Sequence, residues 1–299
     1  MQPVISDVSE CCLVLGGGGV AGIAWMTGLL CGLEESGIDM DGFGTVLGTS
    51  AGAAVGAQVY GGCSLDQLYQ RQVDPAQQVE ELIPSVSLKR VLLKLLPALA
   101  VRKQPEKFRR KVGKMAIRAE TVPAHMRYRV IEQRLKGCRW PERDFKVAVV
   151  NALTGAPEVF DRSSGVSLTD AIAASCAVPG IWPVVDVAGT PFIDGGIRSA
   201  HSADYVCGAQ QVLVLAPMGY KPNFTPDAGL RKEVKMLRDG GARVSVLIPD
   251  DASVVAMGHN PLDPETRAPA ARAGYAQAAM AFTQLEDLPG ENFKAVSSS

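Results

Sequence analysis

Residues 45–53 read Thr45-Val46-Leu47-Gly48-Thr49-Ser50-Ala51-Gly52-Ala53, and this stretch decides the fold of the chain. A short apolar run here meets helix-forming residues at the pattern Gly-x-Ser-x-Gly. A serine between a strand and a helix takes a tight backbone conformation, and Gly48 and Gly52 lack the Cβ atoms that would clash in so sharp a turn. The pattern therefore predicts a nucleophile elbow that exposes the Ser50 hydroxyl at the end of a sheet. Since a chain with 31 glycines can contain this pattern by chance, the neighbouring segments have to support the interpretation.

The segments on both sides of the elbow predict two strand-to-helix units. Residues 11–15 are apolar and lead through a glycine-rich loop into the helix-compatible residues 20–36. Residues 43–47 predict a second strand, and residues 51–60 predict a helix whose N-terminus points at Ser50. Unpaired N–H groups and the helix dipole favour negative charge beside that serine. Two such units in succession are typical of a parallel α/β sheet.

The rest of the chain continues this pattern after a helical insertion at about residues 64–135, which is rich in Lys, Arg, Gln, Leu and Ala. Near-continuous apolar runs predict buried parallel strands. The expected later strands are 145–152, 157–160, 191–193, 211–216 and 243–248, and the expected later helices are 167–176, 229–237 and 265–285. These elements predict one α/β domain over residues 11–285, with residues 1–10 and 286–299 as tails.

The composition is that of an ordinary globular chain with no sign of export or of a metal site. The formal net charge is −1 at pH 7, and the seven cysteines are odd in number with no Cys-x-x-Cys spacing, which predicts free thiols in a reducing cytoplasm. Residues 1–10 carry no lysine or arginine and lack the basic region of a secretory signal. Residues 11–33 are uncharged and long enough for a membrane span, but the glycines at 16–19 would break a helix there. We therefore expect a cytoplasmic protein without a metal ion, one that can associate peripherally with a membrane.

The loop Gly17-Gly18-Gly19-Val20-Ala21-Gly22 fits Gly-x-Gly-x-x-Gly between a strand and a helix, which is the context of a dinucleotide fingerprint. Its backbone N–H groups can approach an anion, either a pyrophosphate or the oxyanion of an acyl-transfer intermediate. A dinucleotide fold would place an acid for the ribose at the end of the second strand, whereas this chain places Ser50 there. The pattern favours acyl transfer and keeps dinucleotide binding as an alternative.

A serine nucleophile needs a base to take its proton. The chain has three histidines, His125, His201 and His259, and none has a flanking pattern that identifies it as catalytic. His201 is the best placed, because it follows Asp194 in the chain order of a catalytic triad. Asp194 itself follows an apolar strand and precedes Gly195-Gly196, so its carboxylate would lie in a turn that another backbone can approach. A plain tight turn is the alternative for these residues.

The motifs at Gly17 to Gly22, Gly48 to Gly52 and Asp194 to Gly196, in this order, resemble those of the patatin-like phospholipase family. The alanine- and proline-containing segment 173–183 looks like the same family, and the resemblance covers roughly residues 11–215. It implies a three-layer α/β/α fold with a mainly parallel sheet. It also implies a serine lipid acyl hydrolase of the phospholipase A, lysophospholipase or lipase type, with no metal and no cofactor.

The resemblance further implies roles for single residues. Ser50 would be the nucleophile and Asp194 its base in a Ser-Asp dyad without a histidine, and the reaction would pass through an acyl-enzyme. The oxyanion hole would be formed by the N–H groups of Gly17, Gly18 and Gly19. Motif support would come from Gly22, Gly48, Gly52, Gly195 and Gly196. Many family members carry Arg or Lys where this chain has Ala21, which leaves recognition of a phosphate open.

Residues 88–96 place leucines and a valine among Lys89, Arg90 and Lys94, as in a helix at a membrane surface. Each cation near an anionic surface adds about 1 kcal/mol of attraction. The alternative is a solvated helical face packed on the domain. Nucleic acid is not expected, because no aromatic residues interleave with these cations. The expected partners are a lipid ester substrate and an anionic membrane, and a family member that binds lipid without catalysis remains the other functional alternative.

Overall fold

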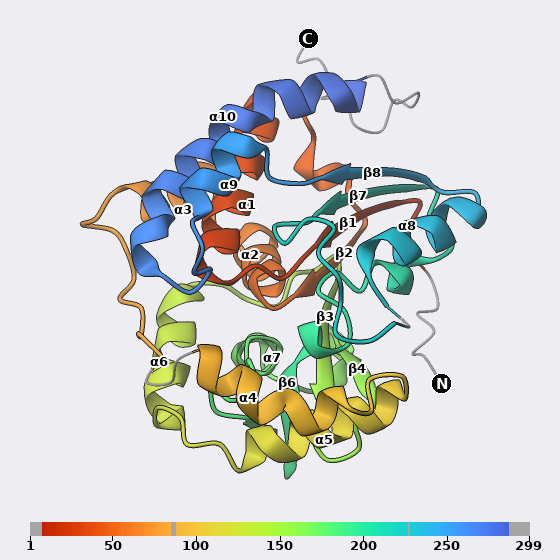
Figure 1. Ribbon diagram of the computed structural model, residues 1–299. Coiled ribbons are helices and arrows are strands. Elements are labelled where there is room, and N and C mark those ends of the chain that lie inside the picture. The colour runs from red at the N-terminus through yellow and green to blue at the C-terminus, as the bar shows by residue number, and fades with distance from the viewer. Residues whose placement is uncertain (1–7, 85–87, 227, 287–299) are drawn as a thin grey trace.

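The computed structural model describes residues 8–84, 88–226 and 228–286, without the side chains of Leu88, Lys89, Leu92 and Glu286. A sheet of eight strands forms its centre, and helices cover the sheet (Figure 1). The strands are β1 (Cys11–Leu15), β2 (Thr45–Thr49), β3 (Asp144–Asn151), β4 (Pro157–Phe160), β5 (Val185–Val187), β6 (Thr190–Asp194), β7 (Gln211–Leu215) and β8 (Arg243–Leu247). The α-helices are α1 (Gly19–Glu35), α2 (Ala51–Tyr60), α3 (Leu65–Val73), α4 (Leu88–Leu99), α5 (Pro105–Ile117), α6 (Ala124–Arg134), α7 (Leu168–Ser175), α8 (Leu230–Asp239), α9 (Asp251–Met257) and α10 (Arg267–Glu286). Most of both expected tails lies outside the described residues.

The sheet is mixed and mainly parallel. Its order is β5-β6-β3-β2-β1-β7-β8, and β4 pairs with β3 beside this path. The five strands from β3 to β8 in this order are parallel, whereas β4 and β6 run antiparallel to β3. The carboxyl ends of β1 and β2 therefore meet at one edge of the sheet, so the glycine-rich loop and Ser50 emerge side by side.

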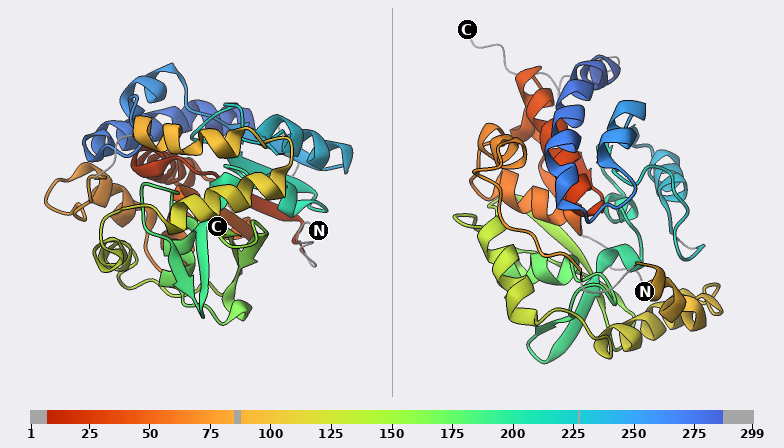
Figure 2. Two further views of the ribbon diagram at one scale, coloured as in Figure 1. Left: turned by 60° about the horizontal axis from the view of Figure 1, so that its bottom comes forward. Right: turned by 60° about the vertical axis from the view of Figure 1, so that its left-hand side comes forward.

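The side chains of β1 alternate between two hydrophobic cores, as the two-residue period of a strand requires. Leu13 and Leu15 pack among residues of α1, α2 and α10 on one face of the sheet. Cys12 and Val14 pack on the other face, where α8 contributes Leu230. The two views of Figure 2 show helices on both sides of the strands. The chain thus folds into the expected three layers of helix, sheet and helix.

Two glycines in α1 allow α10 to approach the backbone of α1 closely. A Cβ atom on Gly28 would lie 2.0 Å from the carbonyl oxygen of Ala271, and one on Gly32 would lie 2.5 Å from the Cβ of Ala278. Larger residues at these positions would push the helices apart. The last described helix therefore helps to hold α1, whose first turn follows the glycine-rich loop.

The expected strands and helices are found, with some shifts at their ends. The strand expected at residues 43–47 is β2, which starts at Thr45 because a short 3-10 turn at Met40–Gly42 precedes it. The sequence pattern misses α9 and also β5, which pairs with β6 in an antiparallel hairpin. Ala188 and Gly189 form the hairpin turn with positive φ angles of 51° and 82°. Three residues are too few to show strand periodicity.

Helices α3 to α6 pack in three places, one of which is the contact between α6 and α7. Helix α3 contacts α1 and α10, while α4 and α5 contact each other and α5 contacts β6. The core below α4 and α5 includes Val91, Phe108 and Trp182. Within the residues that the structure describes, no helix is long and apolar enough to cross a membrane.

Candidate active site

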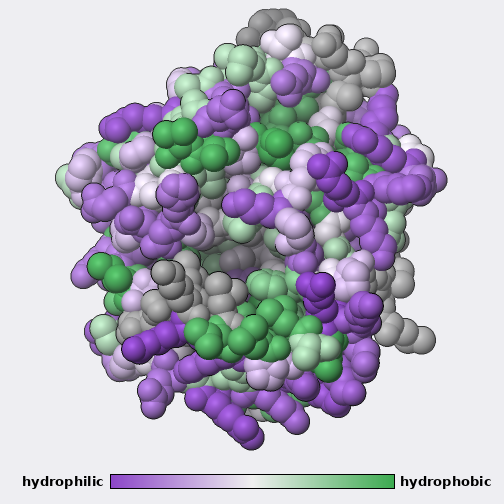
Figure 3. Space-filling view, in the orientation of Figure 1, coloured by the Kyte–Doolittle hydropathy of each residue, from purple (hydrophilic) through white to green (hydrophobic). Residues whose placement is uncertain are grey.

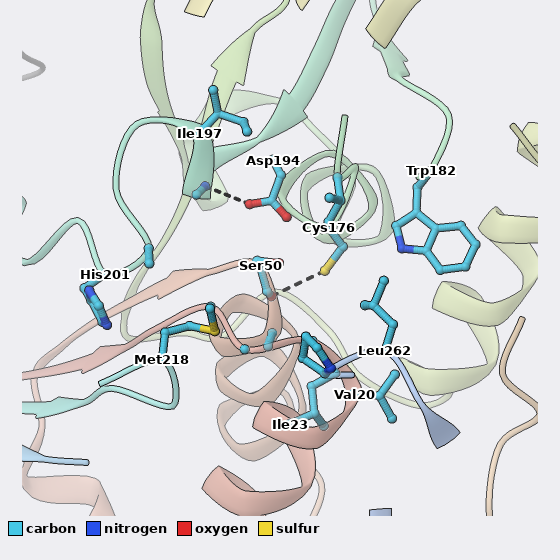
Figure 4. A pocket seen from close by; sticks show the side chains of 18 of the residues that line it. Val20, Ile23, Ser50, Cys176, Trp182, Asp194, Ile197, His201, Met218 and Leu262 are labelled. Atoms are coloured by element: carbon cyan, nitrogen blue, oxygen red, sulfur yellow. Dashed lines mark hydrogen bonds between the residues drawn. The ribbon is translucent and has the colours of Figure 1, made fainter. Parts of the chain in front are cut away.

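Ser50 occupies the turn between β2 and α2 in a strained conformation, with φ 53° and ψ −116°. A positive φ is uncommon for a residue with a side chain and persists only where neighbouring groups hold it. The Ser50 N–H donates to the hydroxyl of Ser175 at 2.9 Å, and that hydroxyl donates to the carbonyl of Ala148 at 2.7 Å. The thiol of Cys176 donates to the Ser50 carbonyl at 3.3 Å (Figure 4). Residues at the end of α7 therefore hold both backbone polar groups of Ser50, its N–H and its carbonyl.

The two glycines that flank Ser50 are required by close backbone contacts. A Cβ on Gly48 would lie 2.4 Å from the Cα of Ala53, and one on Gly52 would lie 1.9 Å from the carbonyl oxygen of Leu15. Helix α2 thus starts directly against β1. This contact holds the elbow next to the glycine-rich loop that follows β1.

Asp194 ends β6 at the level of the elbow. In the sheet register Asp194 pairs with Val149, one residue beyond Ala148, which pairs with Thr49 of β2. Because β6 runs antiparallel to β3, it brings its last residue down to the carboxyl end of β2. The Asp194 side chain is buried, and its Oδ1 accepts the N–H of Gly196 at 2.7 Å (Figure 4).

Burial raises the pKa of Asp194 from an ordinary 3.8 to about 6. The Ser50 hydroxyl, the N–H of Gly196 and the charge of Arg127 oppose this rise, because each stabilises the ionised carboxylate. The carboxyl group therefore lies close enough to Ser50 for the hydroxyl to influence its pKa, which is about 6. A pKa near the working pH is suited to a group that takes up and returns a proton.

The glycine-rich loop presents some of its expected N–H donors and uses another internally. The N–H of Gly17 donates to the carbonyl of Ala200 at 2.7 Å, so it is engaged within the protein. Gly18 and Gly19 stand at the start of α1, where the first N–H groups of a helix lack intrahelical partners. Among the described residues, neither of these two N–H groups donates a backbone hydrogen bond outside the helix. The loop lines the same cavity as Ser50.

His201 lines this cavity too, but it lies apart from Ser50 and Asp194 (Figure 4). It is buried, and neither ring nitrogen has a hydrogen-bond partner in the described part of the chain. Burial lowers the pKa of His201 to about 4. Its ring packs on the loop, because a Cβ on Gly16 would lie 2.6 Å from the His201 Cδ2. His125 and His259 are exposed.

The order of the two pKa values reverses the expectation from ordinary side chains, in which a carboxyl group titrates below an imidazole. If Asp194 is the base, the acid limb of a pH profile is therefore expected near pH 6. The reason is burial, which favours the neutral form of both groups and so raises one pKa and lowers the other.

A cavity of about 380 Å³ opens over Ser50 and Asp194. Its walls are mainly apolar; the side chains labelled in Figure 4 include Val20, Ile23, Trp182, Ile197, Met218 and Leu262. Besides Asp194, four charged side chains line it: Glu81, Arg127, Arg134 and Lys221. Among the described residues, no group of three or more His, Cys, Asp or Glu side chains could hold a metal ion.

Sequence reasoning missed several residues that shape the site. Ser175 and Cys176 lie in the segment that carries the family resemblance, so their place in the motif was a usable signal. Arg127 and Glu81 come from α6 and from the segment between α3 and α4, and no local pattern connects them with Ser50. The partner of Gly17, Ala200, is equally remote in the sequence.

Comparison with known proteins gives a family and two similar folds. A family model described as patatin-like phospholipase matches residues 13–206. A search of curated proteins found no match. The crystal structure of VipD from Legionella pneumophila is similar with a TM-score of 0.45 and 13% identity, over 94% of this chain and 68% of that one. The crystal structure of the type III effector protein ExoU is similar with a TM-score of 0.40 and 16% identity, over 94% of this chain and 54% of that one.

Proposed function

Because this chain belongs to the patatin-like phospholipase family, we propose that it cleaves fatty acyl esters of lipids with Ser50 as nucleophile and Asp194 as base. The matched residues 13–206 include both side chains and support a lipid acyl hydrolase. One observation carries the proposal: a strained serine and a buried carboxylate meet at the wall of a mainly apolar cavity. Such a cavity suits an acyl chain.

In the proposed reaction, Ser50 Oγ attacks the ester carbonyl carbon while the Asp194 carboxylate takes the hydroxyl proton. The N–H groups of Gly18 and Gly19 stabilise the oxyanion that forms, and Gly17 is left out of this set because Ala200 engages its N–H. The protonated Asp194 then donates to the leaving alcohol oxygen as the ester C–O bond breaks. Water attacks the acyl-enzyme with Asp194 again as base, and the proton returns to Ser50 as the fatty acid leaves.

We also propose that α4 contacts an anionic membrane beside the cavity. Its exposed residues combine the cations Arg90 and Lys94 with the apolar Leu93 and Leu96, which are 67% and 57% exposed. Figure 3 shows an apolar patch over α4, next to the hollow at the centre of this face. The Lys89 side chain, expected to take part, lies outside the described residues. The alternative is that α4 presents a solvated helical face.

We further propose that residues 11–285 act as one domain that contains the insertion at about residues 64–135.

A fluorophosphonate probe tests the proposed function against its alternatives. The wild-type protein should be labelled at Ser50, identified by peptide mapping, and Ser50→Ala should remove the label. A family member that binds lipid without catalysis would stay unlabelled and still bind vesicles. A dinucleotide-binding protein would stay unlabelled and bind a nicotinamide dinucleotide at the loop of Gly17 to Gly22.

A further inference from the structure

Three arginines surround one buried glutamate on the wall of the cavity. Glu81, in the segment between α3 and α4, has a side chain that is only 1% exposed. It pairs with Arg127 at 2.8 Å, with Arg134, and with Arg267 at 3.2 Å. Arg127 and Arg134 are seven residues apart and lie on one face of α6, and Arg267 begins α10.

The charges of this cluster do not balance. Three guanidinium groups pair with one carboxylate, so the ion-paired cluster itself carries two more positive than negative charges among largely buried side chains. The nearby carboxylate of Asp194 is influenced by the charge of Arg127 but forms no ion pair with it. Ion pairs in the described ranges join these three arginines to no carboxylate other than Glu81. Arg127 also stacks over the ring of Trp182 at 4.2 Å, which positions the guanidinium but does not neutralise it. Buried positive charge without a counterion is unfavourable, so the cluster is suited to receive an anion.

The cluster and the proposed nucleophile share one cavity. Glu81, Arg127 and Arg134 line the same 380 Å³ cavity as Ser50 and Gly18. Cys176 connects the two places, since its thiol donates to the Ser50 carbonyl. Burial raises the pKa of that thiol to about 11; the charges of Arg127 and Arg134 oppose the rise and those of Asp194 and Glu81 add to it, so all four charged groups lie within electrostatic range of this thiol.

We propose that Arg127 and Arg134 bind a phosphomonoester group at the cavity wall, and that the preferred substrate is an acyl ester carrying this headgroup. A phosphomonoester carries about −1.5 to −2 charges at neutral pH, which is close in size to the net positive charge of the three arginines with Glu81 in place. Arg127 and Arg134 would contact it, because they line the cavity and Arg267 does not. A phosphocholine headgroup has one negative and one positive charge and leaves this net positive charge uncompensated. Planar guanidiniums also suit phosphate, because they can donate two parallel hydrogen bonds to its oxygens. The substrate part of this proposal rests on the proposed function, whereas the anion-binding part does not.

The kinetic test compares soluble octanoyl esters of glycerol, glycerol 3-phosphate and glycerophosphocholine. The wild-type enzyme should hydrolyse the glycerol 3-phosphate ester with a kcat/KM about tenfold or more above the other two. Arg134→Gln should reduce this preference by about tenfold, and it should still fold because Glu81 keeps Arg127 and Arg267 as partners. Arg129→Gln is the matched control, because Arg129 is an exposed residue of the same helix that does not line the cavity. Its preference should equal that of the wild type.

The binding test uses inorganic phosphate and does not need catalysis. At constant ionic strength, phosphate should raise the Tm of Ser50→Ala relative to chloride, and Ser50→Ala/Arg134→Gln should lose this shift. Equal kcat/KM values for the three esters in a protein that is labelled at Ser50 would overturn the headgroup assignment and leave the proposed function standing. If phosphate raises the Tm but the three esters have equal kcat/KM values, the cluster binds free phosphate. The headgroup assignment would then be overturned as well. If Ser50 stays unlabelled and no ester is cleaved, the proposed function fails, and the absence of a phosphate shift would then reject the anion site independently.

Discussion

Asp194→Asn should make the protein more stable at neutral pH, although it removes the proposed base. The folded protein holds the Asp194 proton more tightly than the unfolded chain does, because burial raises the pKa from 3.8 to about 6. The free energy of unfolding of the wild type therefore falls as the pH rises through this interval and stays low above it. Asparagine has no proton to lose and keeps an oxygen for the N–H of Gly196, so the variant avoids this loss.

The size of the effect follows from the pKa shift. A shift of about two units corresponds to about 3 kcal/mol at pH 8, where the loss is complete, and to about 1 kcal/mol at pH 4.5, where it has begun. The difference between variant and wild type should therefore grow by about 2 kcal/mol between these two pH values. Measuring the change between two pH values removes any constant effect of the substitution. Urea unfolding at both pH values, followed by circular dichroism, gives the four free energies needed.

Asp204→Asn is the matched control for this experiment. Asp204 is also a buried carboxylate, but its side chain is paired with Arg198, so its removal strands a buried charge. We expect a loss of about 3–5 kcal/mol at pH 8 in place of a gain. The free energies of unfolding of Asp194→Asn and wild type could instead differ by the same amount at both pH values. That result would refute the account of Asp194 as a buried carboxylate that destabilises the fold when it is charged.

Three other predictions concern the loop, the base and the membrane. The acid limb of kcat/KM should lie near pH 6, the pKa of Asp194, and a limb near pH 4 would instead point to His201 as the base. Gly18→Ala should lower kcat by about a hundredfold, because its Cβ would lie 2.6 Å from the Cβ of a proline and displace an oxyanion donor. Replacing Arg90 and Lys94 with Gln should weaken binding to anionic vesicles in a sedimentation assay, while hydrolysis of a soluble short-chain ester stays unchanged.

Each of these predictions has its own control. Gly17→Ala is the control for Gly18→Ala. The new Cβ would have ordinary contacts of 3.6 Å, and the N–H of Gly17 is already engaged by Ala200. The Gly17→Ala protein should therefore keep its Tm. Equal kcat values for Gly18→Ala and wild type would remove the loop from the mechanism. His201→Ala should retain most activity, and a folded but inactive His201→Ala protein would restore the triad. Unaltered vesicle binding would leave α4 as a solvated face.

Local patterns predicted the elements that bring Ser50 to the sheet edge, because glycine requirements and apolar runs are properties of neighbouring residues. The elbow and the helix at residues 51–60 are examples. The sequence did not predict the antiparallel direction of β6, because strand direction depends on the hairpin with β5 and on pairing with β3. This direction brings Asp194 to the level of Ser50. The resemblance to a family supplied the pairing of the two residues that local physics left open.

Properties that depend on burial could not be predicted from the sequence. The pKa of Asp194 and that of His201 are shifted in opposite directions by surroundings that come from several distant segments. The engaged N–H of Gly17 depends on Ala200, and the cluster around Glu81 depends on residues as far away as Arg267. In each case, the sequence does not show which residues that are distant along the chain lie close together in the fold.

The central place of β1 also has a consequence for synthesis on the ribosome. One neighbour, β2, follows within about 30 residues, but the other neighbour, β7, begins 200 residues after β1 begins. At about 5–20 residues per second, the emerging chain must wait roughly 10–40 s for β7. During that time an apolar strand has one unpaired edge, which is a template for pairing with another chain. Chaperone binding during synthesis would therefore protect the strand on which both the glycine-rich loop and the elbow depend.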